Sequence, residues 1–459
     1  MPYLLRFAFI SALIFYHPDL SAQKVAQQLP EKTRILFLLD ASGSMNASWE
    51  KNQTRMQAAK KLLAELIDSL QENKNLELAL RVYGHQFTVE QRNCEDSKLE
   101  VPFAANNHQR LLQTLQRIQP KGVTPIAYSL QQSAKDFPQS SGYRNILILI
   151  TDGIESCAAD PCKVALELQR KGVFLKPFII GLGLEGQKAF DCMGSYFDAN
   201  NDQTFRQALN DAIEKTFSKT SVSIELLNGA GRPTESNVNV SFINKLTGQA
   251  SYEFVHYLDG KGKPDSVQVD PVLDYDIKVS TLPAVYVDNV NIKHGQHNVI
   301  RIPAAQGHLI VNQEGRKNPG FDVIVREPGK SETLKMQKAE ESVKYLAGTY
   351  ELEVHTLPKR YYTVKLLADR NNMISLPTPG LVNLNTNANG YGSLYEMLPD
   401  GSEEWVMHLD ENKSRMTMVL QPGFYKIAFR VKSAPGSKFT SVKTFEVKPG
   451  TPLNINLFD

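Results

Sequence analysis

Two uninterrupted apolar runs, Ile35–Leu39 and Ile146–Ile150, constrain the fold of this chain more than any other feature. Such runs are typical of parallel strands covered on both faces. Elsewhere, apolar residues recur at three- and four-residue steps, which indicates helices with one buried face. Alternating strands and helices predict a doubly wound α/β domain with a mostly parallel sheet over residues 33–218. The helical segments are Met56–Leu70, Leu111–Ile118, Ile126–Phe137 and Phe205–Ile213, and Val173–Gly183, which contains Pro177, is a further strand candidate.

The remainder of the chain has a different pattern. Beyond residue 220 the helical period is lost, and short segments alternate inward and outward side chains in the manner of half-buried strands. Tyr275, Tyr350 and Tyr425 stand 75 residues apart, each near the start of such a segment. This repeat predicts three all-β, sandwich-like modules, with one or two larger β domains as the alternative. The expected boundaries are 220–305, 306–380 and 381–459.

The first residues have the composition of an export signal. Arg6 precedes a ten-residue apolar core, Phe7–Tyr16, and small residues lead up to Ala22. Ten residues form a helix about half as long as the ~30 Å hydrocarbon layer. We therefore expect a cleaved signal at 1–22, a linker at 23–32, and a secreted, periplasmic or cell-surface protein with no transmembrane segment after cleavage.

Charge and cysteine content restrict the partners and the compartment. The net charge is +2 and both signs are scattered along the chain, which argues against nucleic acid as a partner. Four cysteines all fall within the α/β region, and export predicts that they form disulfides. Three pairings are open; zinc is the alternative, although the His spacing of a zinc site is absent. These cysteines are Cys94, Cys157, Cys162 and Cys192.

Candidate metal ligands follow the two apolar strands. The first strand ends at Asp40, close to Ser42 and Ser44, and the second is followed by Asp152. Because the carboxyl ends of parallel strands meet at one edge of a sheet, we expect these side chains to lie together. Thr124, in a loop before a predicted helix, offers a third hydroxyl. Hard divalent cations prefer such an all-oxygen set, whereas the alternative is that these residues serve only as turn and cap residues.

Three motifs in this order carry a family resemblance. Asp-x-Ser-x-Ser after the first strand, Gly-x-Thr-Pro before a helix and Thr-Asp-Gly after the second strand resemble the metal-ion-dependent adhesion site of von Willebrand factor A domains. The resemblance covers roughly residues 33–218 and implies a Rossmann-like sheet there. It implies that Ser42, Ser44 and Thr124 supply hydroxyls and that the two aspartates bind the metal directly or through water. The later modules resemble the immunoglobulin-like and transthyretin-like domains of exported bacterial proteins.

The resemblance implies a role in binding. One coordination position stays open for an acidic group of a partner, so the expected ligand is an Asp, Glu or other carboxylate on a protein. Two carboxylates roughly cancel a divalent charge, and neutral hydroxyls leave its pull on a further anion intact. Mg²⁺ is the expected cation, with Mn²⁺ or Ca²⁺ as alternatives. His85 and Glu155 are candidate ligand-contact residues at the rim.

The motifs argue against an enzyme. The chain has no phosphate-binding Gly-x-x-x-x-Gly-Lys loop, no His-Glu-x-x-His and no Gly-x-Ser-x-Gly elbow. Mg²⁺ lowers the pKa of water weakly compared with zinc, so a metal-dependent hydrolase is a minor alternative. A second alternative is an envelope structural or assembly protein whose β modules form the main contact surface.

Overall fold

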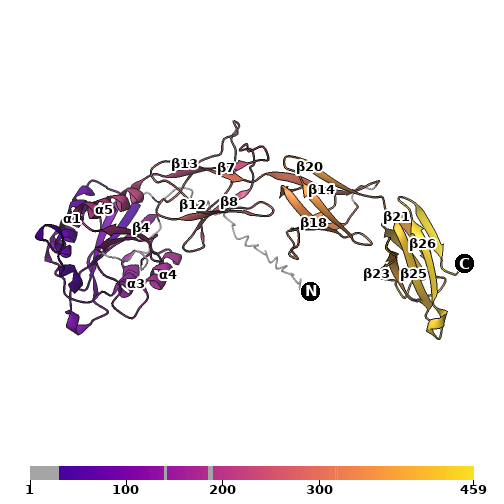
Figure 1. The fold of residues 1–459 in the computed structure, drawn as a ribbon, viewed down its shortest axis with the longest axis horizontal. Helices are drawn as coiled ribbons and strands as arrows, with labels where there is room; N and C mark the ends of the chain where they lie inside the picture. The colour runs from indigo at the N-terminus through magenta and orange to yellow at the C-terminus, as the bar shows by residue number, and fades with distance from the viewer. Residues whose placement is uncertain are drawn as a thin grey trace, which may run out of the picture.

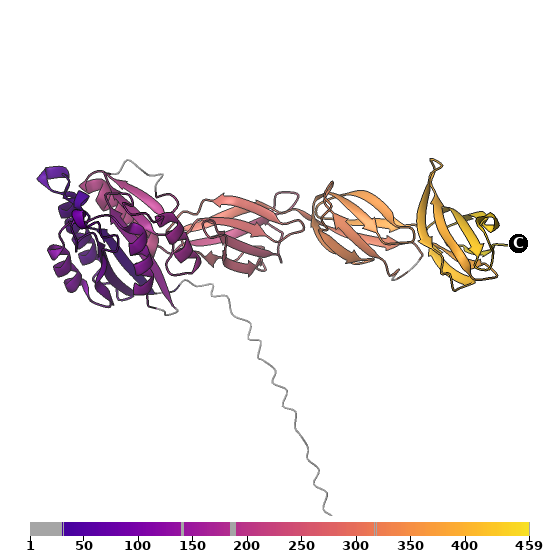
Figure 2. The same cartoon turned by 90° about the horizontal axis from the view of Figure 1, so that it is seen from below.

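The chain forms four bodies that follow one another in a row (Figures 1 and 2). The computed structural model describes residues 30, 32–138, 142–183, 190–315, 317 and 319–458. The predicted signal at 1–22 and most of the predicted linker lie outside the described residues. Within the described residues, no helix has the length and apolarity to cross a membrane.

The first body contains a six-stranded sheet in the order β3-β2-β1-β4-β5-β6. Its strands are parallel except β3, which runs antiparallel to β2. The two apolar runs form the central strands β1 and β4, and Leu39 pairs with Ile150. The bounds are β1 Lys32–Asp40, β2 Leu76–Tyr83, β3 Ser97–Ala104, β4 Tyr143–Thr151, β5 Phe178–Leu182 and β6 Ser195–Ala199.

The fifth strand is shorter than predicted. β5 begins at Phe178, directly after Pro177, so the prediction of a strand from Val173 was wrong for its first residues. Proline has no N–H to donate to a sheet and is confined to strand starts and edges. Leu175, two residues before the proline, instead donates its N–H to the Asn145 carbonyl at the start of β4.

Helices cover both faces of the sheet. Apolar residues of α1, α2 and α5 pack with Ile35, Phe37 and Leu39, whereas those of α3 and α4 pack with Leu36 and Leu38 on the other face. The predicted doubly wound α/β fold is thus confirmed. The bounds are α1 Arg55–Ser69, α2 His108–Arg117, α3 Ile126–Asp136, α4 Pro161–Arg170 and α5 Asp202–Phe217, with short 3-10 turns at Gly43–Asn46, Glu50–Asn52 and Val89–Gln91.

Each of the three following bodies pairs a three-stranded sheet with a four-stranded sheet around its own apolar cluster. We call them β modules 1, 2 and 3. In each, the first and last strands pair in parallel, and the other pairs are antiparallel. The predicted all-β architecture is confirmed; independent folding of each module as a domain stays a prediction.

The strands of β module 1 form the sheets β10-β7-β13 and β12-β11-β8-β9. They are β7 Ser221–Leu227, β8 Asn239–Asn244, β9 Ala250–Val255, β10 Val267–Gln268, β11 Tyr275–Val279, β12 Val285–Val290 and β13 His297–Pro303. β module 2 has β14 Gln306–Gln313, β15 Asp322–Arg326, β16 Lys335–Lys338, β17 Val343–Leu346, β18 Gly348–Val354, β19 Arg360–Leu366 and β20 Asn371–Leu376. β module 3 has β21 Gly380–Asn385, β22 Gly390–Met397, β23 Glu403–His408, β24 Arg415–Leu420, β25 Gly423–Val431, β26 Ser441–Val447 and β27 Pro452–Asn456, and a 3-10 turn at Ser437–Phe439.

The repeated tyrosines have one structural role. Tyr275, Tyr350 and Tyr425 are buried in the cores of the three modules. Each hydroxyl donates to a backbone carbonyl four or five residues upstream, at 2.9, 2.8 and 2.6 Å. The ring therefore fills the core while its polar end is satisfied, as in the tyrosine corners of β-sandwiches.

Buried carboxylates join the successive modules. Glu235 of β module 1 accepts hydrogen bonds from Gln306 and Lys344 of β module 2, at 3.0 and 3.3 Å. Glu396 of β module 3 accepts two bonds from the Arg360 guanidinium of β module 2, at 2.7 and 2.8 Å. Paired, directional bonds of this kind fix the orientation of one module on the next. The three modules accordingly extend away from the α/β body as one continuous stalk (Figure 2).

Candidate metal centre

Three loops meet above the carboxyl ends of the central strands. Ser42, after β1, forms a parallel bridge with Gly122, and the Gly43 N–H donates to the Gly122 carbonyl at 2.8 Å. Gly84, after β2, has a φ of +69°, and a Cβ there would lie 2.6 Å from the Val123 carbonyl oxygen and 2.9 Å from the Ser42 Cα. Only glycine fits so close an approach in this conformation. The three loops are therefore packed against one another.

The predicted ligands of the first and second strand ends are in direct contact. Asp40 accepts hydrogen bonds from the Ser42 N–H and the Thr151 hydroxyl, both at 2.7 Å. The Ser44 hydroxyl donates to Asp152 at 2.7 Å and lies 3.0 Å from the Ser42 hydroxyl. Two carboxylates and two hydroxyls thus form one connected group at the edge of the sheet.

The fifth predicted ligand lies beside this group. A Cβ placed on Gly153 would stand 3.7 Å from the Thr124 hydroxyl oxygen and 3.9 Å from the Ser44 hydroxyl oxygen. Both hydroxyls therefore flank the residue that directly follows Asp152. Thr124 and Asp152 are buried, whereas Ser44 is exposed. The group is thus open to solvent on one side.

The charges of this group are not balanced by the protein alone. Asp40 is fully buried; burial, followed by the nearby Asp152 carboxylate, raises its pKa to about 6 against hydrogen bonds from Ser42 and Thr151 that lower it. Burial, followed by the nearby Asp40 carboxylate, also raises the pKa of the Tyr83 hydroxyl in the same region. Burial and a neighbouring negative charge thus both disfavour the ionised form of Asp40. An added cation fits this environment.

Arg55 is a component that the sequence reasoning missed. Its guanidinium donates to Asp152 at 2.8 Å, and its side chain is 23% exposed while that of Asp152 is fully buried. Arg55 is the first residue of α1 and lies between Thr54 and Gln57, which form the capping box of this helix. A basic residue is unfavourable in the first turn of a helix because of the helix dipole. That local conflict is the signal in the sequence that could have identified it.

The donor set is that of a hard cation. Within the described ranges, no group of three or more His, Cys, Asp or Glu side chains is arranged to hold a metal. The four cysteines form the disulfides Cys94–Cys157 and Cys162–Cys192. The candidate centre therefore depends on hydroxyl oxygens beside its two carboxylates. Such an all-oxygen donor set suits Mg²⁺, whereas zinc prefers nitrogen and sulfur ligands.

The two candidate rim residues are engaged in local contacts. His85 lies 2.9 Å from Glu100, on β3. Glu155 accepts hydrogen bonds from the N–H groups of Ala127 and Cys157, at 2.7 and 2.9 Å. Glu155 is thus bound to the loops of the site, and Ser156 beside it, which sequence reasoning also missed, contacts Thr124.

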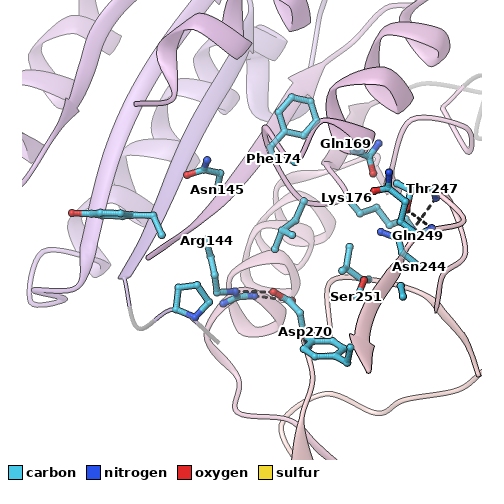
Figure 3. Close-up of a pocket in the computed structure, with 17 residues that line it drawn as sticks. Arg144, Asn145, Gln169, Phe174, Lys176, Asn244, Thr247, Gln249, Ser251 and Asp270 are labelled. Carbon is cyan, nitrogen blue, oxygen red and sulfur yellow. Dashed lines mark hydrogen bonds and ion pairs between the residues drawn. The ribbon is translucent and has the colours of Figure 1, made fainter. Parts of the chain in front are cut away.

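A cavity of about 330 Å³ lies at the junction with β module 1 (Figure 3). It is near the start of β4, whereas Asp152 follows its end; eight residues of strand separate the two by roughly 26 Å. Its charged groups are paired across the junction: Arg144 with Asp270, and Lys176 with Asp274. Among the described residues that line the cavity, every charged side chain is thus paired, so the strand edge is the better candidate site.

The α/β body resembles known proteins. Residues 35–155 match the family model of the von Willebrand factor type A domain. The uncharacterized protein YwmC of Bacillus subtilis (strain 168) is 27% identical over 216 residues, which is 45% of this chain and 91% of that protein. The uncharacterized protein YwmD of the same organism is 29% identical over 212 residues, 43% of this chain and 90% of that protein.

Solved structures are also similar. An aerotolerance-related membrane protein from Bacteroides fragilis NCTC 9343 is 19% identical with a TM-score of 0.32, over 40% of this chain and 99% of that chain. The pilus adhesin SpaC from Lactobacillus rhamnosus GG, in its open conformation, is 13% identical with a TM-score of 0.34, over 90% of this chain and 65% of that chain. At these TM-scores the solved structures add nothing to the family match.

Proposed function

We propose, from the match of residues 35–155 to the von Willebrand factor type A domain model, that this chain is an exported, non-catalytic protein that binds a protein partner through a divalent cation. The observation that carries the proposal is the convergence of five oxygen-bearing side chains at one sheet edge, one of them the fully buried carboxylate of Asp40. Mg²⁺ is the proposed cation, with Mn²⁺ or Ca²⁺ as alternatives. The residues that would hold it are Asp40, Ser42, Ser44, Thr124 and Asp152.

The charges of the site support this use. A divalent cation bound there would offer an open coordination position to a carboxylate of the partner. Asp40 and Asp152 supply two negative charges and the hydroxyls none, so the loaded site retains attraction for a further anion. Ser44 is exposed at the open side, where a ligand can approach. The disulfides and the stalk suit a protein that acts outside the cytoplasm.

Exposed apolar residues favour a protein partner over a glycan. In the described part of the α/β body, the exposed large hydrophobic side chains are Phe87, Val89 and Ile154. The side chain of Val89 lies against Gly43, since a Cβ on that glycine would be 3.2 Å from the Val89 Cγ2 atom. Ile154 follows Asp152 by two residues. Apolar side chains beside a charged centre are typical of protein interfaces. The proposed ligand is a carboxylate set among apolar side chains.

Changing these apolar residues is expected to separate partner capture from metal binding. The double variant Phe87→Ser/Ile154→Ser should lose at least fivefold in Mg²⁺-dependent retention on peptides that carry one glutamate between apolar neighbours, because the apolar contact is removed. Its affinity for Mg²⁺ should be unchanged. Val255→Ser is the control, since Val255 is 61% exposed on β module 1. A protein ligand of this kind would be contradicted if the double variant were retained as well as the unaltered protein. It would also be contradicted if the unaltered protein were retained equally on peptides whose glutamate has polar neighbours.

Arg55 is expected to oppose metal binding. Its guanidinium contacts Asp152, so a cation held by that carboxylate experiences like-charge repulsion. Arg55→Gln should tighten Mg²⁺ binding by roughly tenfold, about 1.4 kcal/mol, in a calorimetric titration. Arg206→Gln, which removes a guanidinium paired with Glu65 on the exposed surface, should leave the affinity unchanged. Weaker binding in Arg55→Gln would mean instead that Arg55 is needed to orient Asp152.

A further inference from the structure

Ser156 forms hydrogen bonds with both the backbone N–H and the backbone carbonyl of Thr124. The Thr124 N–H donates to the Ser156 hydroxyl at 2.7 Å, and the Ser156 N–H donates to the Thr124 carbonyl at 3.1 Å. Ser156 lies in the loop 153–157, which directly follows Asp152, the first residue after β4. The loop next to one proposed metal-binding carboxylate thus also fixes the backbone of the proposed metal-binding threonine.

Glu155 also forms hydrogen bonds that fix the segment around Thr124. One carboxylate oxygen accepts from the Ala127 N–H at 2.7 Å and the other from the Cys157 N–H at 2.9 Å. Ala127 is in the first turn of α3, whose N-cap residue, Pro125, makes no side-chain cap bond. A carboxylate stabilises the unpaired N–H groups at a helix N-terminus. Glu155 therefore caps α3 from another loop and anchors the helix that begins just after Thr124.

The Cys94–Cys157 disulfide fixes the position of this loop. It ties loop 153–157 to the loop between β2 and β3, across 63 residues of sequence. The second loop also contacts the site, since a Cβ on Gly122 would lie 2.8 Å from the Phe87 carbonyl oxygen. The loop of Thr124 is therefore enclosed by two loops that are covalently joined to each other. Such a cross-link restricts the separation of those loops.

We propose that Ser156 and Glu155 are positioning residues for Thr124, and that the Cys94–Cys157 disulfide keeps them in place, so that metal affinity depends on this disulfide. The proposal rests on the proposed metal site. A dithiol reductant breaks the Sγ–Sγ bond in a two-electron exchange, leaving two protein thiols and the cyclic disulfide of the reductant. The metal site is then complete only in an oxidising compartment.

The test uses two cysteine variants of the whole protein. Cys94→Ser/Cys157→Ser removes the disulfide on which the proposal rests. Cys162→Ser/Cys192→Ser removes the other disulfide and is the matched control. Calorimetric titration of Mn²⁺ should show about tenfold weaker binding in the first variant and a change within twofold in the control, since one ligand of the set is loosened. In the metal-free proteins, exchange of the amide hydrogens of Thr124, Ile126 and Ala127 should be at least tenfold faster in the first variant only.

Two single substitutions keep both disulfides and test the same contacts. Ser156→Ala should accelerate exchange of the Thr124 amide and weaken Mn²⁺ binding, and Ser156→Thr, which retains a hydroxyl acceptor, should restore both. These variants decide the question if the cysteine variants do not fold. Unchanged exchange and unchanged affinity in the variants would overturn the proposal while the metal site stands. Absence of Mn²⁺ binding in the unaltered protein would refute the proposed function, and the exchange rates would still decide whether Ser156 holds Thr124.

Discussion

Replacing Arg144 by methionine is expected to lower the free energy of unfolding by about 3–5 kcal/mol. The Arg144 guanidinium, on β4, donates two hydrogen bonds of 2.8 Å to Asp270 of β module 1 and a third to the Thr216 carbonyl near the end of α5. The two side chains of the pair are only 8% and 3% exposed. Methionine leaves the Asp270 carboxylate buried without its cation, which destabilises more than loss of the pair itself.

Denaturant unfolding followed by tryptophan fluorescence measures this effect. Trp49 lies in the α/β body and reports its unfolding, whereas the second tryptophan, Trp405, lies in β module 3. Arg206→Met is the control: its ion pair with Glu65 is exposed, so the expected loss is at most about 1 kcal/mol. Adding Asp270→Asn to Arg144→Met should recover part of the stability. Equal losses in Arg144→Met and the control would show that this junction does not stabilise the α/β body.

Asp40→Asn is expected to reduce divalent-cation affinity at least 100-fold while the metal-free protein stays folded. The carboxylate is fully buried, lies beside Asp152 and is an essential charge of the proposed site. In the metal-free state the substitution removes one of two neighbouring buried charges and keeps a polar group for Thr151 and the Ser42 N–H. The variant is therefore expected to lose cation binding and to remain folded.

Thermal unfolding with and without Mg²⁺ separates these effects. At a Mg²⁺ concentration 100 times the dissociation constant, the unaltered protein should gain about 2.7 kcal/mol, and Asp40→Asn should gain none. Asp198→Asn, which changes an exposed carboxylate on β6, should behave like the unaltered protein. An equal rise in Tm for Asp40→Asn would place the cation elsewhere.

The sequence was informative where local patterns determine structure. A strand buried on both faces must be apolar throughout, so Ile35–Leu39 and Ile146–Ile150 identified the centre of the sheet, and parallel pairing then brought Asp40 and Asp152 to one edge. The 75-residue spacing of the tyrosines likewise indicated three similar modules, because each needs one buried ring with a satisfied hydroxyl. Metal binding by the assembled residues stays a prediction.

The missed features depend on contacts between distant segments. Arg55 reaches Asp152 across 97 residues and Arg144 reaches Asp270 across 126. Helical periodicity describes which face of a helix is buried, and it says nothing about which carboxylate a long cationic side chain will meet. The cysteine pairing was open for the same reason, since four cysteines allow at most two disulfides and only the fold selects Cys94–Cys157.

The most direct test of the central claim is a calorimetric titration of Mg²⁺ into the purified protein after removal of bound cations with a chelator, with Asp40→Asn alongside. The account predicts saturable binding of one cation per chain, accompanied by a rise in Tm, and loss of both in the variant. Absence of saturable binding and of any rise in Tm at Mg²⁺ concentrations up to about 10 mM, above the range of weak extracellular cation sites, would contradict it.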